Sequence, residues 1–331
     1  MTDRDAVLRP VEADGEAGPL VGGSALDAVH RMEENVARVV RGKPEAIRLA
    51  VLAVLARGHL LIEDVPGVGK TMLAQALARS LGLAFQRIQF TSDLLPSDII
   101  GVSIFNQAKQ EFAFVPGPLF ANVVLADEIN RATPKTQSAL LEAMSEHRVS
   151  VERKRYTLPQ PFVVLATQNP LEYLGTFPLP ESQLDRFLIS LRLGYPPHAD
   201  ERDLLLSGGV EEVLEHLQPV ITREELVSLQ ERVSAVRVAE KITDYLLVLA
   251  ETTRRGGEFM LGVSTRGVQG LYRAAQALAL CEGRSYVVPD DVQRLAPAVL
   301  AHRVVLKRGS GGVDAARDAV ARVVAATPVP L

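Results

Sequence analysis

The pattern of apolar and polar positions along the 331-residue chain changes near residue 195. Before that point, short apolar runs typical of buried strands alternate with stretches of helical period. Strands are expected at 59–63, 84–90, 122–125, 162–166 and 187–193. Helices are expected at 24–41, 44–57, 72–79 and 134–147. Because strands that alternate with helices pair in parallel, this half of the chain predicts a three-layer α/β fold.

The character of the chain changes after the consecutive prolines Pro196 and Pro197. The later segments with helical period are 199–208, 222–235, 239–255, 265–282, 289–302 and 313–326. We therefore expect an α/β domain over 24–195 and a smaller all-helical domain over 196–331. The first 23 residues are polar, acidic and contain glycine, and this composition predicts a disordered N-terminal tail over 1–23.

Two short insertions interrupt the α/β pattern. Apolar pieces near 101–115 flank a polar link, which predicts a β-hairpin inserted into the fold. A second hairpin is expected near 148–158, with the basic tip Arg153, Lys154 and Arg155. The three charges at this tip are typical of a solvated end, and contact with nucleic acid is the alternative. The hairpins themselves are candidates either for contact with a partner or for packing between subunits.

The most specific motif is Asp64–Thr71, which reads Asp-Val-Pro-Gly-Val-Gly-Lys-Thr between an apolar strand and a helix. Backbone N–H groups of such a loop and of the helix N-terminus bind phosphates, and the helix dipole favours negative charge there. Lys70 is expected to reach the β- and γ-phosphates and the Thr71 hydroxyl to hold Mg²⁺. The residues expected to bind the nucleotide are Pro66, Gly67, Val68, Gly69, Lys70, Thr71, Met72 and Asp127.

Asp64 departs from the general phosphate-loop pattern, which has glycine at this position. A carboxylate that faced the phosphates would be unfavourable. We therefore expect the Asp64 side chain to lie at the strand end and to point away from the nucleotide.

Polar side chains follow the next two buried strands. Asp127 and Glu128 end the run 123–126, where an Asp helps to hold Mg²⁺ and a Glu polarises the attacking water. Asn169 follows the strand 162–166, and we expect it beside the two carboxylates if the two strands are neighbours. Its amide would contact the γ-phosphate or the attacking water. The carboxyl ends of strands face the ligand in open α/β sheets, which is why these positions carry the chemistry.

Two arginines are further candidates. Arg186 precedes the last strand, and Arg266 lies at the start of a helix in the second domain. A guanidinium is always charged and binds phosphate oxygens with two donors at once. Because the helix dipole disfavours a cation at a helix start, Arg266 requires a reason other than helix stability.

Composition narrows the function classes. The net charge of −4 and the pI near 5.9 argue against nonspecific nucleic-acid binding over the whole surface. The absence of tryptophan and the 5% of aromatic residues argue against base stacking as a binding mode. Cys281 is the single cysteine and is expected in the core, so no internal disulfide forms and a cytoplasmic location is predicted. The scattered histidines exclude a zinc site, and no segment predicts a transmembrane helix or a secretion signal.

The motifs together resemble the AAA+ ATPases and, within them, the MoxR family. The resemblance covers about residues 24–310 and depends on the order in which several motifs occur along the chain. It uses the segments 61–71, 90–101, 126–132, 166–170, 179–187 and 264–266. Asn130, Arg131 and the two hairpins are similar to the branch that carries an insert in helix 2, to which magnesium-chelatase subunits also belong.

The resemblance assigns a role to each matching position. Lys70 and Thr71 look like the Walker A pair, and Asp127 and Glu128 look like Walker B. Asn169 is similar to sensor 1. Arg266 is similar to sensor 2, and Arg186 is similar to the arginine finger that acts on ATP in the neighbouring subunit. The expected cofactors are therefore ATP and Mg²⁺, and the catalytic residues are Glu128, Asn169, Arg186 and Arg266. A homo-oligomeric ring is implied, most often a hexamer in relatives.

The function that the resemblance implies is chaperone-like remodelling or maturation of a protein partner. The client class that it suggests is a protein with a von Willebrand factor A domain. Two alternatives remain open from the residues: a nucleotide-gated binding scaffold with slow hydrolysis, and a DNA-remodelling ATPase. The acidic pI and the few aromatic residues rank the DNA alternative last.

Overall fold

The computed structural model describes residues 25–107, 110–170, 175–206, 209–255, 257–307 and 312–329. The predicted tail over 1–23 lies outside the described residues. The central sheet is parallel, with the strand order β2-β5-β8-β1-β9. Its strands are β1 (Leu60–Glu63), β2 (Phe85–Gln89), β5 (Val123–Asp127), β8 (Val163–Gln168) and β9 (Ile189–Leu191). The predicted α/β fold with a parallel sheet is confirmed.

Helices cover both faces of this sheet. The helices α1 (Ala25–Ala37), α2 (Pro44–Leu55) and α3 (Lys70–Ser80) share a hydrophobic core with one face, and α5 (Pro134–Glu146) packs on the other. Alternate strand residues divide between the two cores: Leu125 belongs to the first and Val124 to the second. Because successive side chains of a strand point to opposite faces, a strand buried on both sides is apolar throughout.

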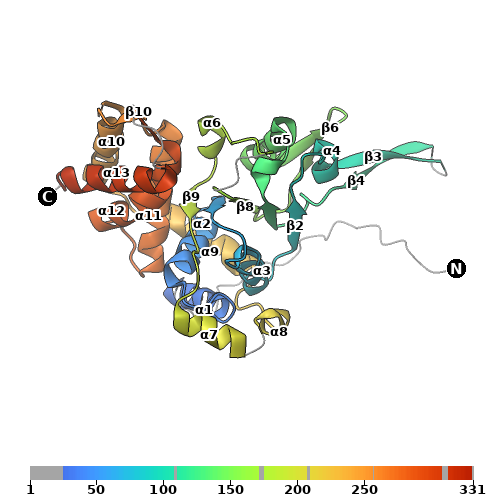
Figure 1. Ribbon diagram of the computed structural model, residues 1–331, viewed down its shortest axis with the longest axis horizontal. Coiled ribbons are helices and arrows are strands. Elements are labelled where there is room, and N and C mark those ends of the chain that lie inside the picture. The colour runs from blue at the N-terminus through green and yellow to red at the C-terminus, as the bar shows by residue number, and fades with distance from the viewer. Residues whose placement is uncertain are drawn as a thin grey trace.

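The segment 101–116 forms an antiparallel hairpin of β3 (Gly101–Asn106) and β4 (Glu111–Pro116), which follows the short helix α4 (Pro96–Ile100). The second hairpin pairs β6 (Arg148–Val151) with β7 (Lys154–Thr157). Phe114 stacks on Tyr156 with ring centroids 4.0 Å apart, so the base of the first hairpin packs on the second. Figure 1 shows β3 and β4 projecting from the side of the molecule opposite the C-terminal helices.

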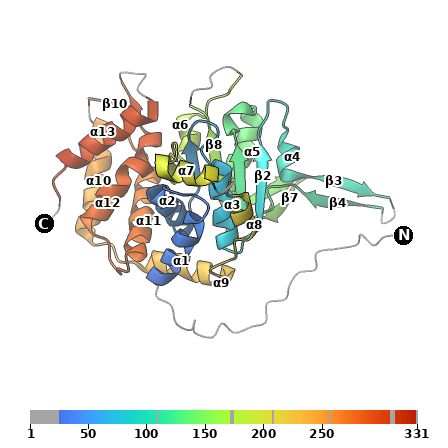
Figure 2. The ribbon, with the colours of Figure 1, turned by 60° about the horizontal axis from the view of Figure 1, so that its bottom comes forward.

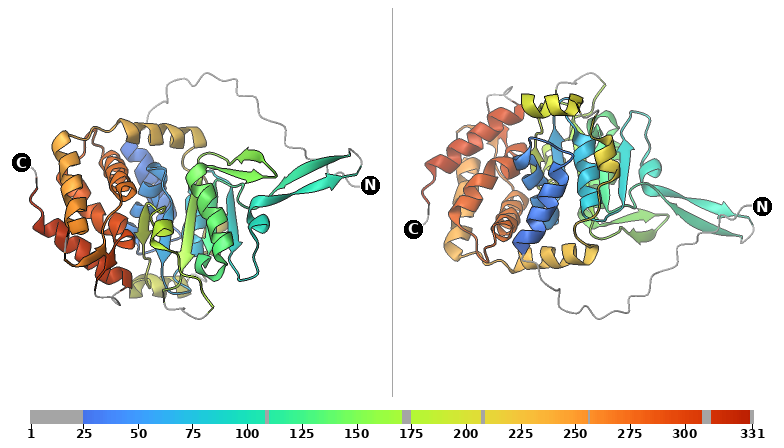
Figure 3. Two further views of the ribbon diagram at one scale, coloured as in Figure 1. Left: turned by 90° about the horizontal axis from the view of Figure 1, so that it is seen from above. Right: turned by 90° about the horizontal axis from the view of Figure 1, so that it is seen from below.

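The chain after β9 is mainly helical. Its elements are α7 (His198–Leu206), α8 (Glu211–Glu215), α9 (Arg223–Ala235), α10 (Glu240–Arg255), α11 (Thr265–Cys281), α12 (Pro289–Leu300) and α13 (Gly312–Ala326). In Figures 2 and 3, α10 to α13 form one bundle, whereas α7 and α8 lie beside α2 and α3. In the described part of this half, β10 (Phe259–Leu261) and β11 (Val305–Leu306) form a two-stranded sheet, which departs from the all-helical expectation. These strands are too short for a sequence pattern to reveal.

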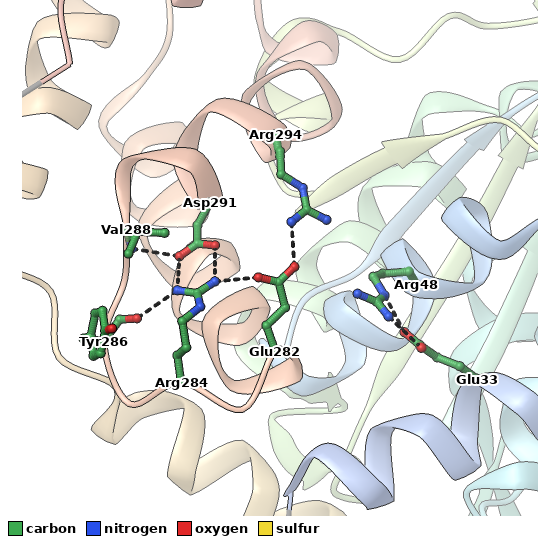
Figure 4. Close-up of polar contacts among 8 residues, drawn as sticks. All are labelled: Glu33, Arg48, Glu282, Arg284, Tyr286, Val288, Asp291 and Arg294. Carbon is green, nitrogen blue, oxygen red and sulfur yellow. Dashed lines mark hydrogen bonds and ion pairs between the residues drawn. The ribbon is translucent and has the colours of Figure 1, made fainter.

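Hydrogen bonds between charged side chains hold the connection between α11 and α12. Arg284 donates two hydrogen bonds to Asp291, at 2.6 and 2.8 Å, and one to Glu282 at 2.7 Å (Figure 4). The backbone N–H of Val288 also donates to Asp291, which caps the start of α12. Cys281 is buried at the end of α11, as the sequence predicts. No helix in the described part of the chain is long and apolar enough to cross a bilayer.

Candidate functional site

The loop between β1 and α3 has the backbone conformation of a phosphate cradle. Gly67 and Gly69 have φ of 83° and 91°, in the region that favours glycine. A Cβ at either position would meet no atom within 4 Å, so the backbone angle, not crowding, requires glycine. The Lys70 Nζ donates to the carbonyls of Asp64 and Val65, at 2.8 and 3.0 Å. Burial lowers the pKa of Lys70, which three nearby carboxylates oppose.

A cavity of about 530 Å³ opens at this loop and brings together most of the predicted site. The predicted residues that line it are Pro66, Gly67, Val68, Gly69, Lys70, Thr71, Met72, Asp127, Glu128 and Asn169. The strand pairing explains why they meet, because β5 and β8 are neighbours and β8 also pairs with β1. We expected Asn169 beside Asp127 and Glu128 if their two strands were neighbours, and the pairing of β5 with β8 fulfils that condition.

The Asp64 side chain points away from this cavity, as expected. Its Oδ2 accepts hydrogen bonds from the backbone N–H groups of Leu193 and Gly194, both at 2.7 Å. Its Oδ1 accepts from Val65 N at 2.9 Å. Asp64 is 7% exposed, and its carboxylate accepts from backbone N–H groups, which hold it away from the phosphate loop.

Asp127 is held by two side chains from neighbouring strands. The Thr167 hydroxyl donates to its Oδ1 at 2.6 Å, and Arg87 donates to its Oδ2 at 2.6 and 3.1 Å. Thr167 also accepts from the Glu128 N–H at 2.8 Å. Glu128 has φ of 57°, a left-handed conformation that costs free energy for a residue with a Cβ and is common at functional sites.

The Glu128 carboxylate lies at the rim of the cavity between two donors. Gln89 donates to its Oε2 at 2.9 Å, and Arg131 lies 3.1 Å from the same oxygen. Gln89 and Arg87 both belong to β2, the strand next to β5. Sequence reasoning missed both residues. The signal was present, because they are polar residues near the carboxyl end of a strand, but it required knowing that β2 lies beside β5.

The donors fit Mg²⁺. Thr71 and Asp127 are hard oxygen donors that line the same cavity. Among the described residues no group of three or more His, Cys, Asp or Glu is arranged to hold a metal. Mg²⁺ keeps several waters and takes one or two protein ligands together with substrate phosphates, a role that Thr71 and Asp127 could fill.

The cavity also has an apolar wall, formed by Val39, Val40, Met72, Pro196, Leu204 and Val210. The basic residues Arg41 and Lys43 line the cavity as well. The apolar residues come from the α1–α2 connection, from α3 and from the segment that leads into and out of α7. A flat apolar base fits such a surface, because ligand sites combine apolar walls with a few placed polar groups. Apart from Met72, the sequence reasoning did not find these residues, since they belong to segments without a motif.

Arg186 and Arg266 do not line this cavity. Both line a second cavity of about 310 Å³, together with Arg57, Arg273 and Arg303. None of the described residues around it lines the first cavity. The Arg186 guanidinium donates to Leu141 O and Ser145 Oγ, both at 2.6 Å. The structure therefore places the two predicted arginines together, and both apart from Lys70.

A set of polar contacts among Asp185, Ser264 and Arg303, which we call the polar brace, joins the segments that carry these two arginines. Asp185 accepts from the Ser264 hydroxyl at 2.9 Å, and Ser264 caps α11 through Gly267 N. The Arg303 Nε lies 3.3 Å from the same carboxylate. Arg303 also donates to Phe187 O at 2.5 Å, and burial lowers its pKa to about 10. The brace fixes the Arg186 loop relative to the helix start that carries Arg266.

Comparison with known proteins agrees with this geometry. Residues 59–189 match the ATPase family associated with various cellular activities (AAA), and residues 251–322 match the AAA lid domain. The chain is 50% identical to YeaC of Bacillus subtilis, over 90% of this chain and 93% of that protein. It is 41% identical to the chaperone MoxR1 of Mycobacterium tuberculosis, over 87% and 79%. A solved structure from Cytophaga hutchinsonii, assigned as an ATPase, has a TM-score of 0.83 and 34% identity, covering 93% and 96%.

Proposed function

Because this chain belongs to the MoxR-like AAA+ ATPases, we propose that it hydrolyses ATP with Mg²⁺ as part of a homo-oligomer. The observation that carries the proposal is that Lys70, Asp127 and Glu128 converge on one cavity that also has an apolar wall. The charged groups suit a triphosphate, and the apolar wall suits a base.

Each polar group at the cavity has a proposed role. Lys70 and the backbone of 66–72 bind the phosphates, and Asn169 orients the γ-phosphate or the attacking water. Glu128 accepts a proton from that water. Thr71 and Asp127 would hold Mg²⁺, which when bound neutralises charge on the β- and γ-phosphates.

The second cavity supports an active site that a neighbouring copy of the chain completes. In one copy of the chain, Arg186 and Arg266 line a different cavity from Lys70. We propose that they act on ATP held by the neighbouring copy, within a ring. A hexamer is the ring size that the family resemblance suggests. A monomer would then have incomplete catalytic machinery.

A mixing experiment tests this arrangement. Lys70→Ala removes phosphate binding but keeps both arginines, whereas Arg186→Ala keeps the phosphate loop. Each variant alone should lose ATP hydrolysis. A mixture should recover a measurable fraction of the wild-type rate, because some interfaces combine an intact loop with an intact arginine. If the mixture stays inactive although both variants assemble, as judged by light scattering with ATP and Mg²⁺, Arg186 does not act between subunits.

We further propose that hydrolysis drives chaperone-like remodelling of a protein client, for which a protein with a von Willebrand factor A domain is the suggested class. A relative named as a chaperone supports this. The β3–β4 hairpin, with the exposed Ile104, Phe105 and Phe112, is the candidate contact. One cysteine in the chain supports a cytoplasmic location.

Client capture tests this part of the proposal. A Glu128→Gln variant loaded with ATP should retain a client that wild type releases after hydrolysis. If the client binds differently with ATP and ADP but its own activity never changes, the protein is a nucleotide-gated scaffold. If DNA stimulates hydrolysis and binding falls steeply with salt, the DNA-remodelling alternative is correct.

A further inference from the structure

Asp64 connects the phosphate loop with the chain segment that leaves the central sheet. Its main chain belongs to the site: Asp64 N donates to Gln168 O, next to Asn169, and Asp64 O accepts from Lys70 Nζ. Its side chain accepts from the N–H groups of Leu193 and Gly194, just after β9. One residue therefore contacts both the phosphate side of the cavity and the segment 193–197.

The segment 193–197 leads directly to the apolar wall of the cavity. Pro196 lines the cavity, α7 begins at His198, and Leu204 of α7 lines the same cavity. Two successive N–H groups, of Leu193 and Gly194, point at one carboxylate oxygen, and Gly194 has φ of 61°, in the region that favours glycine. A second contact holds the same segment, because Lys43 Nζ donates to Tyr195 O.

The two bonds to Asp64 carry much of the constraint on this segment. Leu193 is buried, and its N–H would lose its acceptor without the carboxylate. Unpaired buried donors are costly, and bonds to a charged acceptor are stronger than neutral ones. The position of the apolar wall therefore depends on the carboxylate of Asp64, which is itself a residue of the phosphate loop.

We propose that Asp64 is a positioning residue that couples the phosphate loop to the wall for the nucleoside, and so sets how strongly the base and ribose add to nucleotide affinity. This proposal rests on the proposed nucleotide site. Asp64 does not contact the phosphates through its side chain. Its effect passes through the segment 193–197 to Pro196 and Leu204, which line the cavity.

The substitution Asp64→Gly separates this role from support of the loop. Glycine is the residue of the general phosphate-loop pattern, so the loop keeps an allowed sequence and loses only the carboxylate. Two probes separate the contributions of the apolar wall and the phosphate loop: ADP carries base and ribose, whereas pyrophosphate has neither. Their affinities are measured by competition against a fluorescent ADP analogue in the presence of Mg²⁺.

We expect Asp64→Gly to weaken ADP binding about tenfold and pyrophosphate binding less than about twofold. Asp64→Asn, which keeps one acceptor oxygen, should give an intermediate loss for ADP. Asp244→Asn removes an exposed carboxylate on α10 and is the matched control, with both affinities unchanged. A partly unfolded variant lowers both affinities by the same factor, so the ratio still reports coupling.

Hydrogen exchange gives a direct second measurement. ADP should slow amide exchange over 193–206 in wild type and not in Asp64→Gly. Equal losses for ADP and pyrophosphate in the folded variant, or no loss for either, would overturn the coupling. If wild type binds neither compound, the nucleotide site itself is wrong, which is a different failure.

Discussion

Gln89 donates a hydrogen bond of 2.9 Å to Glu128, across the pairing of β2 with β5. The same strand supplies Arg87 to Asp127, so each of the two site carboxylates has a partner on β2. These contacts hold both carboxylates in place. Fixed dipoles and charges at a reacting centre lower the cost of reorganisation during reaction.

Replacing Glu128 by Gln should separate binding from turnover. The amide has nearly the same shape and still offers an oxygen to Gln89, but it no longer accepts a proton from water. We expect turnover to fall by about 10² to 10⁴, with ATP affinity nearly unchanged. Phosphate release measures the first effect and equilibrium titration the second. A variant with wild-type turnover would remove Glu128 from the mechanism.

Removing Arg303 should destabilise the protein strongly. Its side chain is 2% exposed, it is paired with Asp185, and it donates to the Phe187 carbonyl. Arg303→Met removes the cation that is paired with Asp185 and a donor to Phe187 O, which should cost about 3–5 kcal/mol of unfolding free energy. Arg322→Met breaks a surface pair with Glu258 and should change stability by less than about 1 kcal/mol. Urea unfolding compares the two, and equal effects would show that the brace contributes little.

Acid should destabilise the fold through two buried histidines. Burial lowers the pKa of His59 to about 4 and that of His302 to about 3. Both are neutral in the folded state, whereas the unfolded chain takes up protons below about pH 6.5. The unfolded state then binds more protons, so stability must fall as pH decreases from about 6.5 toward the folded pKa values. Each histidine should account for about 2 kcal/mol of loss by pH 5.

His302→Leu tests this pH dependence. Its Nε2 contacts Phe187 O, and its Nδ1 has no partner, so the substitution removes one hydrogen bond together with the titrating group. The unfolding free energy of this variant should fall less between pH 6.5 and pH 5 than that of wild type. His198→Gln, at an exposed position on α7, is the control and should follow the wild-type profile. An unchanged slope in His302→Leu would contradict the assignment.

Cys281 should be unreactive in the folded protein. Burial raises the pKa of its thiol to about 12, and the thiolate is the reactive form. A thiol reagent at pH 8 should therefore modify no cysteine until denaturant is added, and then one per chain. Rapid modification of folded protein, followed by absorbance, would show that α11 opens locally.

The sequence by itself determined the parts of this protein that depend on neighbours along the chain. The order of strand, glycine loop and helix placed Lys70 and Thr71. Apolar runs that end in polar residues placed Asp127, Glu128 and Asn169 at strand ends. Even the orientation of Asp64 was predictable, because a carboxylate facing phosphates is unfavourable.

The tertiary structure alone decided which distant residues meet. Arg87 contacts a carboxylate 40 positions away, and Ser264 contacts one 79 positions away. Those contacts depend on strand order and on how the C-terminal helices pack against the sheet, which no local periodicity encodes. For the same reason the separation of Arg186 and Arg266 from Lys70 emerged only in the folded chain, since packing across the sheet sets which cavity each side chain lines.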